Sequence, residues 1–491
     1  MSSLHSKMAK GAAWMVLFKL LERSIGLFSM IFLARILVPA DFGLVSIATA
    51  SIAILEVLGS FSFDIALIQR KDCDRSHYDT AWTFNVIVGI SASLLVLALA
   101  QSASSFYNEP RLKDLLYLLA LSPLAGSLEN IGIVAFRKEM NFHKEFAFLI
   151  SKRLIATTLT LILAVTLRSY WALALGVLAG RIVGTTLSYL VNSYRPRLAL
   201  SKRKELMSFS VWSFTTNFLQ FASNRIGDFI IGRVNGPTSL GIYNIGYEIS
   251  NLPTTELVAP INRAVFSAYA KMSTEELKVG YLLVVETVSF IAIPAALGIA
   301  SIADILVPTL LGDKWVEAIP LIKILSFYGL IQALTSNIGS VYYALGLPRI
   351  ITKYYIFHVL ILIPGFFIGT NFFGPKGAAF SLLIATVTIV PFNLKNLFHL
   401  INVQLKEFSK RIWRPIVASL TMLLGLMTIK SHHLCICSKE SIYNLAFIAI
   451  TGVIFYIATV YALWISCGKP EGIESHALLR LKHAYNKDSS R

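Results

Sequence analysis

Three ionisable residues lie near the middle of an apolar stretch close to the N-terminus. They are Lys19, Glu22 and Arg23 in the sequence FKLLERSIG, which follows AAWMVL and precedes LFSMIFLA. A charge at the centre of a membrane-spanning helix costs at least about 2.5–3.5 kcal/mol, so such residues are expected to face a wet cavity or one another. Arginine and lysine at that depth could bind an anionic group such as a phosphate, and glutamate a proton or a cation.

The composition places these charges in a membrane protein. The chain has 491 residues, of which 55% are hydrophobic and only 14% are charged, and its mean hydropathy is +0.67. Soluble globular proteins are about 25% charged. The sequence therefore predicts an all-α polytopic membrane protein with about fourteen spans of roughly 20 apolar residues each. The predicted spans lie near residues 12–35, 43–64, 80–103, 114–135, 147–168, 170–192, 207–232, 240–268, 279–311, 317–346, 351–373, 376–399, 411–430 and 443–466.

Positive charge is distributed unevenly along the loops. The net charge is +17, and roughly 30 of the 44 lysines and arginines fall in the two termini and in the loops that follow an even-numbered span. About 9 fall in the opposite loops, so the positive-inside rule predicts that both termini lie in the cytoplasm. The basic runs RPRLALSKRK (195–204) and KEFSKRIWR (406–414) then set orientation and contact anionic head groups. A nucleic-acid partner is not expected.

Motifs for catalysis, metal binding and disulfide formation are weak or missing. The chain has four cysteines, too few and too scattered for a disulfide framework. The sequence HHLCIC (432–437) resembles a metal-binding tract but has no second cluster of ligands, so neither a metal nor a cofactor is expected. No phosphate-binding loop, zinc-protease motif or hydrolase nucleophile motif occurs. An enzymatic activity is therefore not expected. The N-terminal segment is too long and too charged for a signal peptide and is predicted to be a retained helix.

The two halves of the chain resemble each other. At an offset of 198 residues, Trp14, Arg35, Pro39 and Gly43 are matched by Trp212, Arg233, Pro237 and Gly241. The tripeptide NIG at 130–132 recurs at 337–339. Spans 1–6 and 7–12 are thus predicted to be two copies of one unit in the same orientation, two parallel six-helix lobes around a central cavity. The predicted division is 1–198 for the N-lobe, 199–402 for the C-lobe and 403–491 for two further spans and a cytoplasmic tail.

The repeat pairs the opening stretch with a second polar stripe. Lys19, Glu22 and Gly26 correspond to Asn217, Gln220 and Asn224, and the second stripe continues into Arg225 and Asp228. Residues three and four apart share one helical face, so each stripe is predicted to line the cavity opposite the other. The alternative is pairing within each helix, of Glu22 with Lys19 or Arg23 and of Arg225 with Asp228, which makes the charges tolerable.

Further charged residues lie inside other predicted spans. They are Glu56, Glu129, Arg181, Glu248, Glu256 and Arg263. Arg181 lies within the glycines of a G-x-x-x-G-x-x-x-G ridge (176–184), which close helix packing explains better than ligand binding does. Glu248 and Arg263 could instead lie at the membrane interface, because the eighth predicted span is long and is interrupted by two prolines.

Several sequence motifs together resemble one transporter family. LARILVPADFGL (33–44), LIQRKD (67–72), FRKEMNF (136–142), YWALALG (170–176), YRPRL (194–198), GDFIIGR (227–233), LLGDKW (310–315) and ALGLPR (344–349) occur in order along the chain. This set resembles the Wzx-type polysaccharide exporters of the MOP flippase superfamily. One departure is Ser60-Phe61-Ser62, where the family often has Asp-Phe-Gly, with an acid displaced to Asp64.

The resemblance implies a flippase that moves an undecaprenyl-diphosphate-linked oligosaccharide across the inner membrane by alternating access, without covalent catalysis. The residues that it would use for the diphosphate are Lys19, Arg23, Arg181, Arg225 and Arg263. Those that would contact sugars or line the cavity are Asn217, Gln220, Asn224, Tyr243, Asn244 and Tyr247. Those that could bind a coupling ion are Glu22, Glu56, Asp228 and Glu248.

The resemblance also implies which partners the protein has, and it leaves alternative functions open. The partners are the lipid-linked substrate, membrane lipids and the polysaccharide polymerase or export machinery. One alternative is a multidrug antiporter of the same superfamily, which the deep arginines disfavour because its cargo is cationic. A peptidoglycan lipid flippase is a second alternative. A glycan polymerase or ligase is a third, disfavoured because no large extracytoplasmic loop is predicted.

Overall fold

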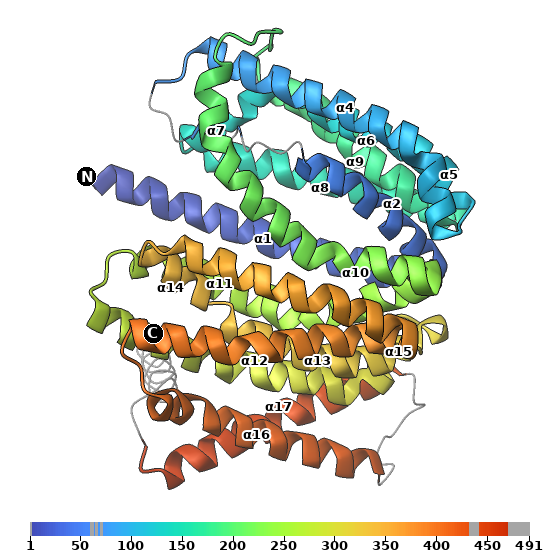
Figure 1. Cartoon of the computed structure of the whole chain (residues 1–491). Coiled ribbons are helices and arrows are strands. Elements are labelled where there is room, and N and C mark those ends of the chain that lie inside the picture. The colour runs from blue at the N-terminus through green and yellow to red at the C-terminus, as the bar shows by residue number, and fades with distance from the viewer. Residues whose placement is uncertain (1, 59–62, 64–66, 69–71, 432–440, 470–491) are drawn as a thin grey trace, which may run out of the picture. The chain divides into compact units, whose positions relative to one another are not determined.

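The computed structural model of the chain describes residues 2–58, 63, 67–68, 72–431 and 441–469 (Figure 1). Every regular element in these ranges is a helix. Nine helices of this described part are long and apolar enough to cross a membrane, and a bent pair, Arg111–Ser127 with Ile131–Lys138, would make a tenth. The predicted class, an all-α polytopic membrane protein, is confirmed, and the count of fourteen spans stays a prediction. The HHLCIC tract, the Ser60–Ser62 motif and Asp64 lie outside the described residues.

The chain forms two compact units, each with its own core. The first contains residues 1–242 and 366–378, and the second contains 243–365 and 379–491. The helices of the first unit are α1 (Ser2–Ile36), α2 (Pro39–Leu58), α4 (Arg75–Tyr107), α5 (Arg111–Leu119), α6 (Leu121–Ser127), α7 (Val134–Lys138), α8 (Phe142–Leu167), α9 (Tyr170–Val191) and most of α10 (Arg203–Leu252). In this unit α8 packs against α1 and α9, and α2 packs against α4 and α9.

The second unit is built around one long helix. Its helices are α11 (Ala259–Tyr269), α12 (Thr274–Leu310), α13 (Ala318–Thr335), α14 (Ile338–Ala344), most of α15 (Pro348–Leu400), α16 (Leu405–Ser431) and α17 (Ile442–Ser466). Helix α12 packs against α13, α16 and α17 (Figure 1). Its N-terminus is fixed by a capping box, in which Ser273 and Glu276 bond each other's backbone amides.

Two long helices bend sharply at glycines. Within α10, Gly236 has a φ of 79°, and within α15, Gly374 has a φ of 59°. A residue with a side chain rarely adopts these angles, so glycine allows the chain to change direction without a loop. Each of these long elements is thus two helices joined at a kink.

The repeat predicted from the sequence has a direct structural counterpart. A Cβ atom at Gly43 would overlap the carbonyl oxygen of Pro237, and one at Gly241 would overlap the carbonyl oxygen of Pro39. The contact is therefore reciprocal between residues that the sequence repeat matches, and the division into two lobes stays a prediction. Only glycine lets the two helix starts approach this closely.

The NIG tripeptide also has the same role in both copies. Asn130 and Asn337 are fully buried, and each is the residue that begins a short helix after a break in a longer one. The Asn130 amide donates to the Tyr194 carbonyl oxygen at 2.7 Å. The Asn337 amide donates to Asn262 Oδ1 and its oxygen accepts from the Tyr269 hydroxyl, both at 2.8 Å. In both places the buried asparagine side chain thus ties the break to a segment more than sixty residues away in the sequence.

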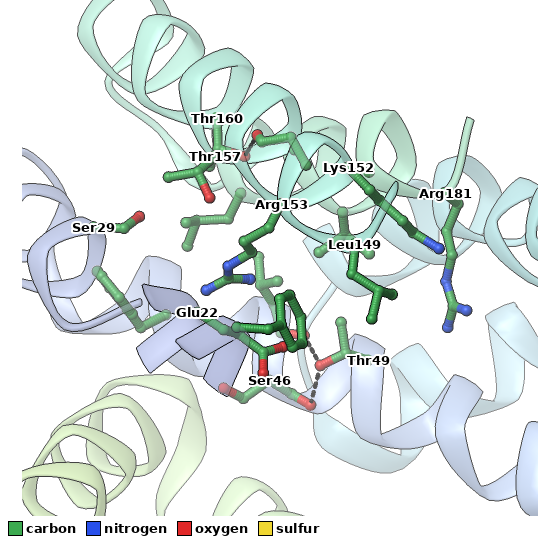
Figure 2. A pocket seen from close by; sticks show the side chains of 18 residues that line it. Glu22, Ser29, Ser46, Thr49, Leu149, Lys152, Arg153, Thr157, Thr160 and Arg181 are labelled. Atoms are coloured by element: carbon green, nitrogen blue, oxygen red, sulfur yellow. Dashed lines mark hydrogen bonds between the residues drawn. The ribbon is translucent and has the colours of Figure 1, made fainter. Parts of the chain in front are cut away.

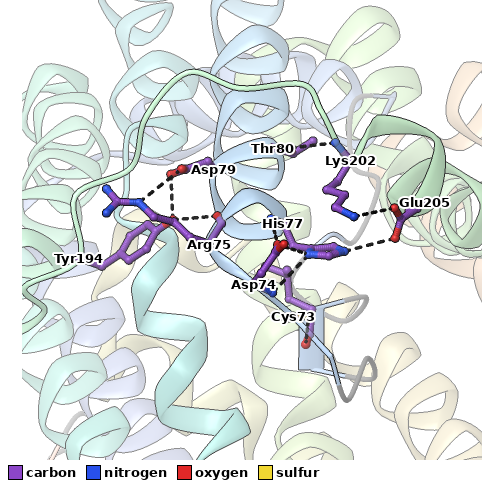
Figure 3. Close-up of polar contacts among 10 residues, drawn as sticks. Cys73, Asp74, Arg75, His77, Asp79, Thr80, Tyr194, Lys202 and Glu205 are labelled. Carbon is purple, nitrogen blue, oxygen red and sulfur yellow. Dashed lines mark hydrogen bonds and ion pairs between the residues drawn. The ribbon is translucent and has the colours of Figure 1, made fainter.

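The segment between α9 and α10 lies along the start of α4. The backbone N–H of Arg197 donates to Asp79 Oδ1 at 2.8 Å, and that of Ala199 donates to Thr83 Oγ1 at 2.9 Å. The Tyr194 hydroxyl also donates to Asp79, at 2.8 Å. We call Asp79, Thr83, Tyr194 and these backbone groups the linker cluster; Figure 3 shows Asp79 and Tyr194. It positions an extended segment by bonding its backbone to side chains of a helix.

A second set of contacts lies beside the linker cluster. His77 lies between Asp74, 2.5 Å from its Nδ1, and Glu205 at the start of α10, 3.3 Å from its Nε2 (Figure 3). The hydrogen bond from His77 holds the pKa of the Asp74 carboxyl below its usual value. In the linker cluster, burial and the hydrogen bond to Asp79 raise the pKa of Tyr194, so its hydroxyl remains a donor.

Candidate functional site

A cavity of about 630 Å³ lies inside the first unit, between α1, α2, α8 and α9. Figure 2 shows Glu22 from α1 and Lys152, Arg153 and Arg181 from α8 and α9 around it. Among its described lining residues are three cations and one carboxylate. The cavity therefore favours an anionic group.

Two of the three cations are paired with carboxylates from other elements. Arg181 Nη2 lies 3.0 Å from Glu56 Oε1 of α2, and Lys152 Nζ lies 2.7 Å from Glu129 Oε2, just after α6. Both pairs join segments that are distant in the sequence. The side chain of Arg181 is 42% exposed, so its pairing with Glu56 leaves part of the guanidinium accessible.

Arg153 is the third cation, and its surroundings differ from those of Lys152 and Arg181. Its Nε is shielded from solvent and has no hydrogen-bond partner among the described residues. Its guanidinium points into the cavity in Figure 2. A Cβ atom at Gly26 of α1 would lie 3.1 Å from Arg153 Nη2, so the glycine leaves room for the guanidinium. An unpaired, shielded N–H is costly, and an anion in the cavity could satisfy it.

The glycine ridge of α9 explains how Lys152 reaches the cavity. Cβ atoms at Gly176, Gly180 and Gly184 would meet Thr160, Ala156 and Lys152, which are spaced by four residues on α8. The ridge therefore lets α8 and α9 approach closely, as the sequence predicted. Gly184 leaves the space in which the Lys152 stem lies before its amine reaches Glu129.

Hydroxyl groups complete the cavity wall. Ser29, Ser46, Thr49, Thr157 and Thr160 all line it. Thr49 and Thr160 each donate to a carbonyl oxygen of the preceding helical turn, at 2.8 Å. Their oxygen atoms can still accept hydrogen bonds, so this wall suits a hydrated or hydroxyl-bearing group.

The predicted stripe on α1 is only partly in the cavity. Lys19 and Glu22 form an ion pair at 2.5 Å, which is one of the alternatives that the sequence left open. Glu22 lines the cavity, while Arg23 is exposed on the surface of α1. The stripe therefore combines pairing within the helix with one cavity-lining carboxylate.

The second predicted stripe, on α10, also contains an internal ion pair. Arg225 Nη1 lies 2.9 Å from Asp228 Oδ2, and Asp228 is buried. Gln220 and Asn224 are exposed, and the side chain of Asn217 lies outside the described part of the chain. The facing arrangement of the α1 and α10 stripes stays a prediction.

The remaining candidates belong to the second unit. Tyr243 is buried, and its ring stacks on Tyr247, whose ring in turn lies 5.9 Å from that of Tyr328. Asn244 is half-buried and Glu248 is exposed. The side chain of Arg263 lies outside the described residues. The roles assigned to these residues stay predictions.

Lys152 and Arg153 were missed by the sequence analysis. Both lie inside the fifth predicted span, where Ser-Lys-Arg interrupts an otherwise apolar run. Two adjacent cations within a span are the same signal that identified Lys19 and Arg23. The signal was therefore present, but the residues had no counterpart in the repeat.

Comparison with known proteins identifies the family. Residues 32–320, more than half of the chain, match the family described as polysaccharide biosynthesis protein. The chain belongs to this family. The match includes Lys152, Arg153 and Arg181 and begins after Lys19, Glu22 and Arg23.

Two relatives show how far the family likeness extends. The lipopolysaccharide biosynthesis protein WzxC of Escherichia coli (strain K12) is 26% identical over 434 residues, which cover 86% of this chain and 87% of the relative. The succinoglycan biosynthesis transport protein ExoT of Rhizobium meliloti (strain 1021) is 22% identical over 328 residues, 65% of each chain. The predicted resemblance to polysaccharide exporters is confirmed.

The fold is that of the MOP superfamily. The lipid II flippase MurJ, in an inward closed conformation, superposes with a TM-score of 0.72 at 14% identity, covering 91% of this chain and 99% of that one. An inward-facing multidrug resistance MATE transporter of the MOP superfamily gives a TM-score of 0.63 at 14% identity, covering 78% and 96%. At this identity the likeness shows the fold alone. The chain is thus a multi-pass membrane protein with a transporter fold.

Proposed function

We propose that the chain flips or exports an undecaprenyl-diphosphate-linked oligosaccharide across the cytoplasmic membrane for the biosynthesis of a surface polysaccharide. The observation that supports this most directly is Arg153, whose guanidinium points into the cavity of the first unit and whose Nε has no hydrogen-bond partner among the described residues, within a family of polysaccharide biosynthesis proteins. The transport proceeds by alternating access and involves no covalent step.

The chemistry of the cavity matches the polar head of such a substrate. A diphosphate leaving water needs charge-assisted hydrogen bonds to replace its hydration. Arg153 offers a planar guanidinium, which can bond two phosphate oxygens at once. Lys152 and Arg181 are each paired with one carboxylate, Glu129 and Glu56, and can add donors when a phosphate displaces that partner. The hydroxyl-lined wall suits the sugar.

The residues predicted from the sequence have secondary roles in this proposal. Lys19, Arg23, Arg225 and Arg263 add positive charge along the path of the diphosphate. Asn217, Gln220, Asn224, Tyr243, Asn244 and Tyr247 contact the glycan along that path. A coupling proton or cation would bind at Glu22, Glu56, Asp228 or Glu248. Glu22 is the strongest of these four, because it lines the same cavity as the cations.

The location and partners follow from the same proposal. The protein lies in the inner membrane with both termini in the cytoplasm, as the distribution of lysine and arginine predicts. Its partners are the lipid-linked substrate, membrane lipids and the polysaccharide polymerase or export machinery.

The test compares two arginines on one helix. Arg153→Gln is expected to reduce surface polysaccharide about ten- to hundredfold, since a hydrogen bond to a charged group contributes about 1.5–3 kcal/mol. Arg168→Gln is the matched control, because Arg168 is exposed at the C-terminal cap of α8. Surface polysaccharide is measured in a deletion strain at matched protein levels. Normal export by the Arg153 variant would overturn the role of the cavity.

Two further measurements separate this proposal from its alternatives. Arg23→Ala and Arg225→Ala are assayed in the same strain, and normal export in both would remove these residues from the path. Drug resistance on expression, with no polysaccharide defect on deletion, would indicate a multidrug antiporter. Loss of viability on deletion would indicate a peptidoglycan lipid flippase. The cation-lined cavity disfavours the antiporter, whose cargo is positively charged.

A further inference from the structure

Basic residues gather on one side of α16, close to its start. Lys406, Lys410 and Arg414 are spaced by four residues and so share a face, and Arg411 lies beside them. All of them except Lys406 line a cavity of about 440 Å³ in the second unit, whose lining also includes Glu407 and Trp413. This cavity is separate from the one in the first unit. We call it the α16 pocket.

Ion pairs between α12 and α16 hold the pocket in shape. Lys278 Nζ of α12 lies 2.9 Å from Glu407 Oε1. Glu286, two turns further along α12, is buried and pairs with Arg411, and its Oε1 lies 3.6 Å from Arg414 Nη2. Arg411 and Arg414 thus share a carboxylate partner on the facing helix, which fixes their side chains.

The positive charges exceed the negative ones. Two arginines share the single carboxylate of Glu286, and Lys278 already offsets Glu407. No carboxylate of the described residues lies within ion-pair distance of Lys410, which is exposed. Arg414 is only 6% exposed, so its charge is held in a site of reduced solvation. Among the described residues at the pocket, cationic side chains outnumber carboxylates, and such a site favours an anion.

Aromatic residues place the pocket at the surface of the bilayer. Trp413 is 39% exposed at the pocket. Near the end of α17, Tyr461 and Trp464 lie with ring centroids 6.1 Å apart, and Cys467, just beyond α17, lines the pocket. Tryptophan and tyrosine concentrate at the level of the lipid head groups. A ligand at this depth that is anionic at one end and apolar at the other is a phospholipid.

The surfaces of α16 and α17 beyond the pocket suit acyl chains. Leu420 and Leu424 of α16 are 50% and 64% exposed, and Ile454 and Ile457 of α17 are 60% and 56% exposed. In a membrane these side chains contact lipid tails. The pocket thus joins a cationic site to an apolar surface long enough for a lipid chain.

We propose that the α16 pocket binds the head group of an anionic phospholipid, with its phosphate at Lys410, Arg411 and Arg414. This binding gives the last two helices a function independent of the proposed substrate path. The proposal does not rest on the proposed function, and its test measures lipid binding rather than export.

The test titrates the purified full-length chain, in a non-ionic detergent, with phosphatidylglycerol and counts bound lipids by native mass spectrometry. Lys410→Gln is expected to weaken phosphatidylglycerol binding about fivefold, because a basic residue near the membrane surface contributes about that factor. Lys406→Gln is the matched control: the same substitution one turn earlier on an exposed residue that does not line the pocket. Its expected effect is less than twofold. Arg411→Gln provides a second variant, and melting temperatures show whether each variant is folded.

Each other outcome contradicts the proposal. Unchanged phosphatidylglycerol binding in folded Lys410 and Arg411 variants would overturn the site. Equal losses for Lys406→Gln and Lys410→Gln would show a diffuse surface charge instead of a pocket. Equally tight phosphatidylcholine binding would show that head-group charge is not recognised. Displacement of the lipid by inorganic phosphate at the same concentration would show a free-anion site instead of a lipid site.

Discussion

The cavity of the first unit and the linker cluster contain similar residue types in different settings. In the linker cluster, Asp79 is buried and accepts from the backbone of Arg197 and from the Tyr194 hydroxyl. In the cavity, Glu56 and Glu129 pair with side-chain cations next to an open volume of about 630 Å³. The carboxylate of the linker cluster, Asp79, fixes the backbone. The carboxylates beside the cavity, Glu56 and Glu129, only offset the charge of neighbouring cations.

This difference separates charged groups that stabilise the fold from charged groups that are available to a ligand. A polar group that bonds to backbone amides contributes to folding, and its removal leaves a donor unsatisfied. A cation beside an open cavity contributes little to folding because water can replace its partner. Substitutions in the two regions should therefore affect different measurements.

The largest expected effect is on export, from the cavity. Replacing Lys152 and Arg153 together by glutamine should reduce surface polysaccharide by at least about tenfold, because two charge-assisted contacts to the substrate are lost. The melting temperature should stay close to that of the unchanged protein. A large fall in stability with normal export per folded molecule would show that the two regions do not differ in this way.

The next effect is on stability, from the linker cluster. Asp79→Ala should lower the free energy of unfolding by about 1–3 kcal/mol, since it leaves the Arg197 amide without its acceptor and leaves the Tyr194 hydroxyl only the Arg75 carbonyl oxygen at 3.2 Å. Thermal unfolding in detergent measures this loss. Export should fall only in proportion to the amount of folded protein, and a greater fall would give the linker a part in transport.

A smaller effect is expected from the ion pair of the cavity. In a double-mutant cycle of Glu56→Gln and Arg181→Gln, the coupling measured by unfolding should be below about 1 kcal/mol, because both side chains are about a third or more exposed. Export should respond more strongly to the Arg181 change than to the Glu56 change. Equal responses would indicate that the pair acts only as a unit.

Tyr194→Phe tests a single hydroxyl of the linker cluster, which has Asp79 and, at 3.2 Å, the Arg75 carbonyl oxygen as acceptors. The variant keeps the ring and loses only the hydroxyl that donates to Asp79 at 2.8 Å. The free energy of unfolding should fall by about 0.5–1.5 kcal/mol, which is less than for Asp79→Ala. A loss equal to that of Asp79→Ala would mean that the backbone bond from Arg197 contributes nothing.

The smallest effect concerns pH. The pKa of Asp74 in the folded chain is lowered from 3.8 by the hydrogen bond from His77. Its stabilising contribution is therefore complete above pH 3.8 and is lost as the pH falls through the lowered pKa. Between pH 8 and pH 5 the contribution of Asp74 to thermal stability should stay constant, because the carboxyl is ionised throughout this range. The Asp74→Asn variant should show a smaller fall in melting temperature below pH 4, and an unchanged fall would assign the acid sensitivity to other groups.

Some contacts were predictable from local spacing. Lys19 with Glu22 and Arg225 with Asp228 are three residues apart, and both pairs form. The glycine ridge of α9 and the repeat at Pro39 and Pro237 also follow from spacing, because periodicity on a helix determines which residues share a face.

Other contacts could not be predicted. Arg181 and Glu56 are 125 residues apart, and Lys152 and Glu129 belong to different helical segments. Which span lies beside which depends on how the helices pack, and a single sequence does not specify this. Arg153 was missed for a related reason. Its role depends on the cavity beside it, and that cavity forms only when the helices pack.

The sequence by itself determined the class of protein and the family, and it predicts the repeat. Hydrophobicity over roughly 20 residues fixes a spanning helix, and motif order identifies relatives. Only the tertiary structure decided which charges meet an open cavity and which bond to backbone. The physical reason is that the free energy of a charge depends on its solvation and its partners, and both are set by helices that are distant in the sequence.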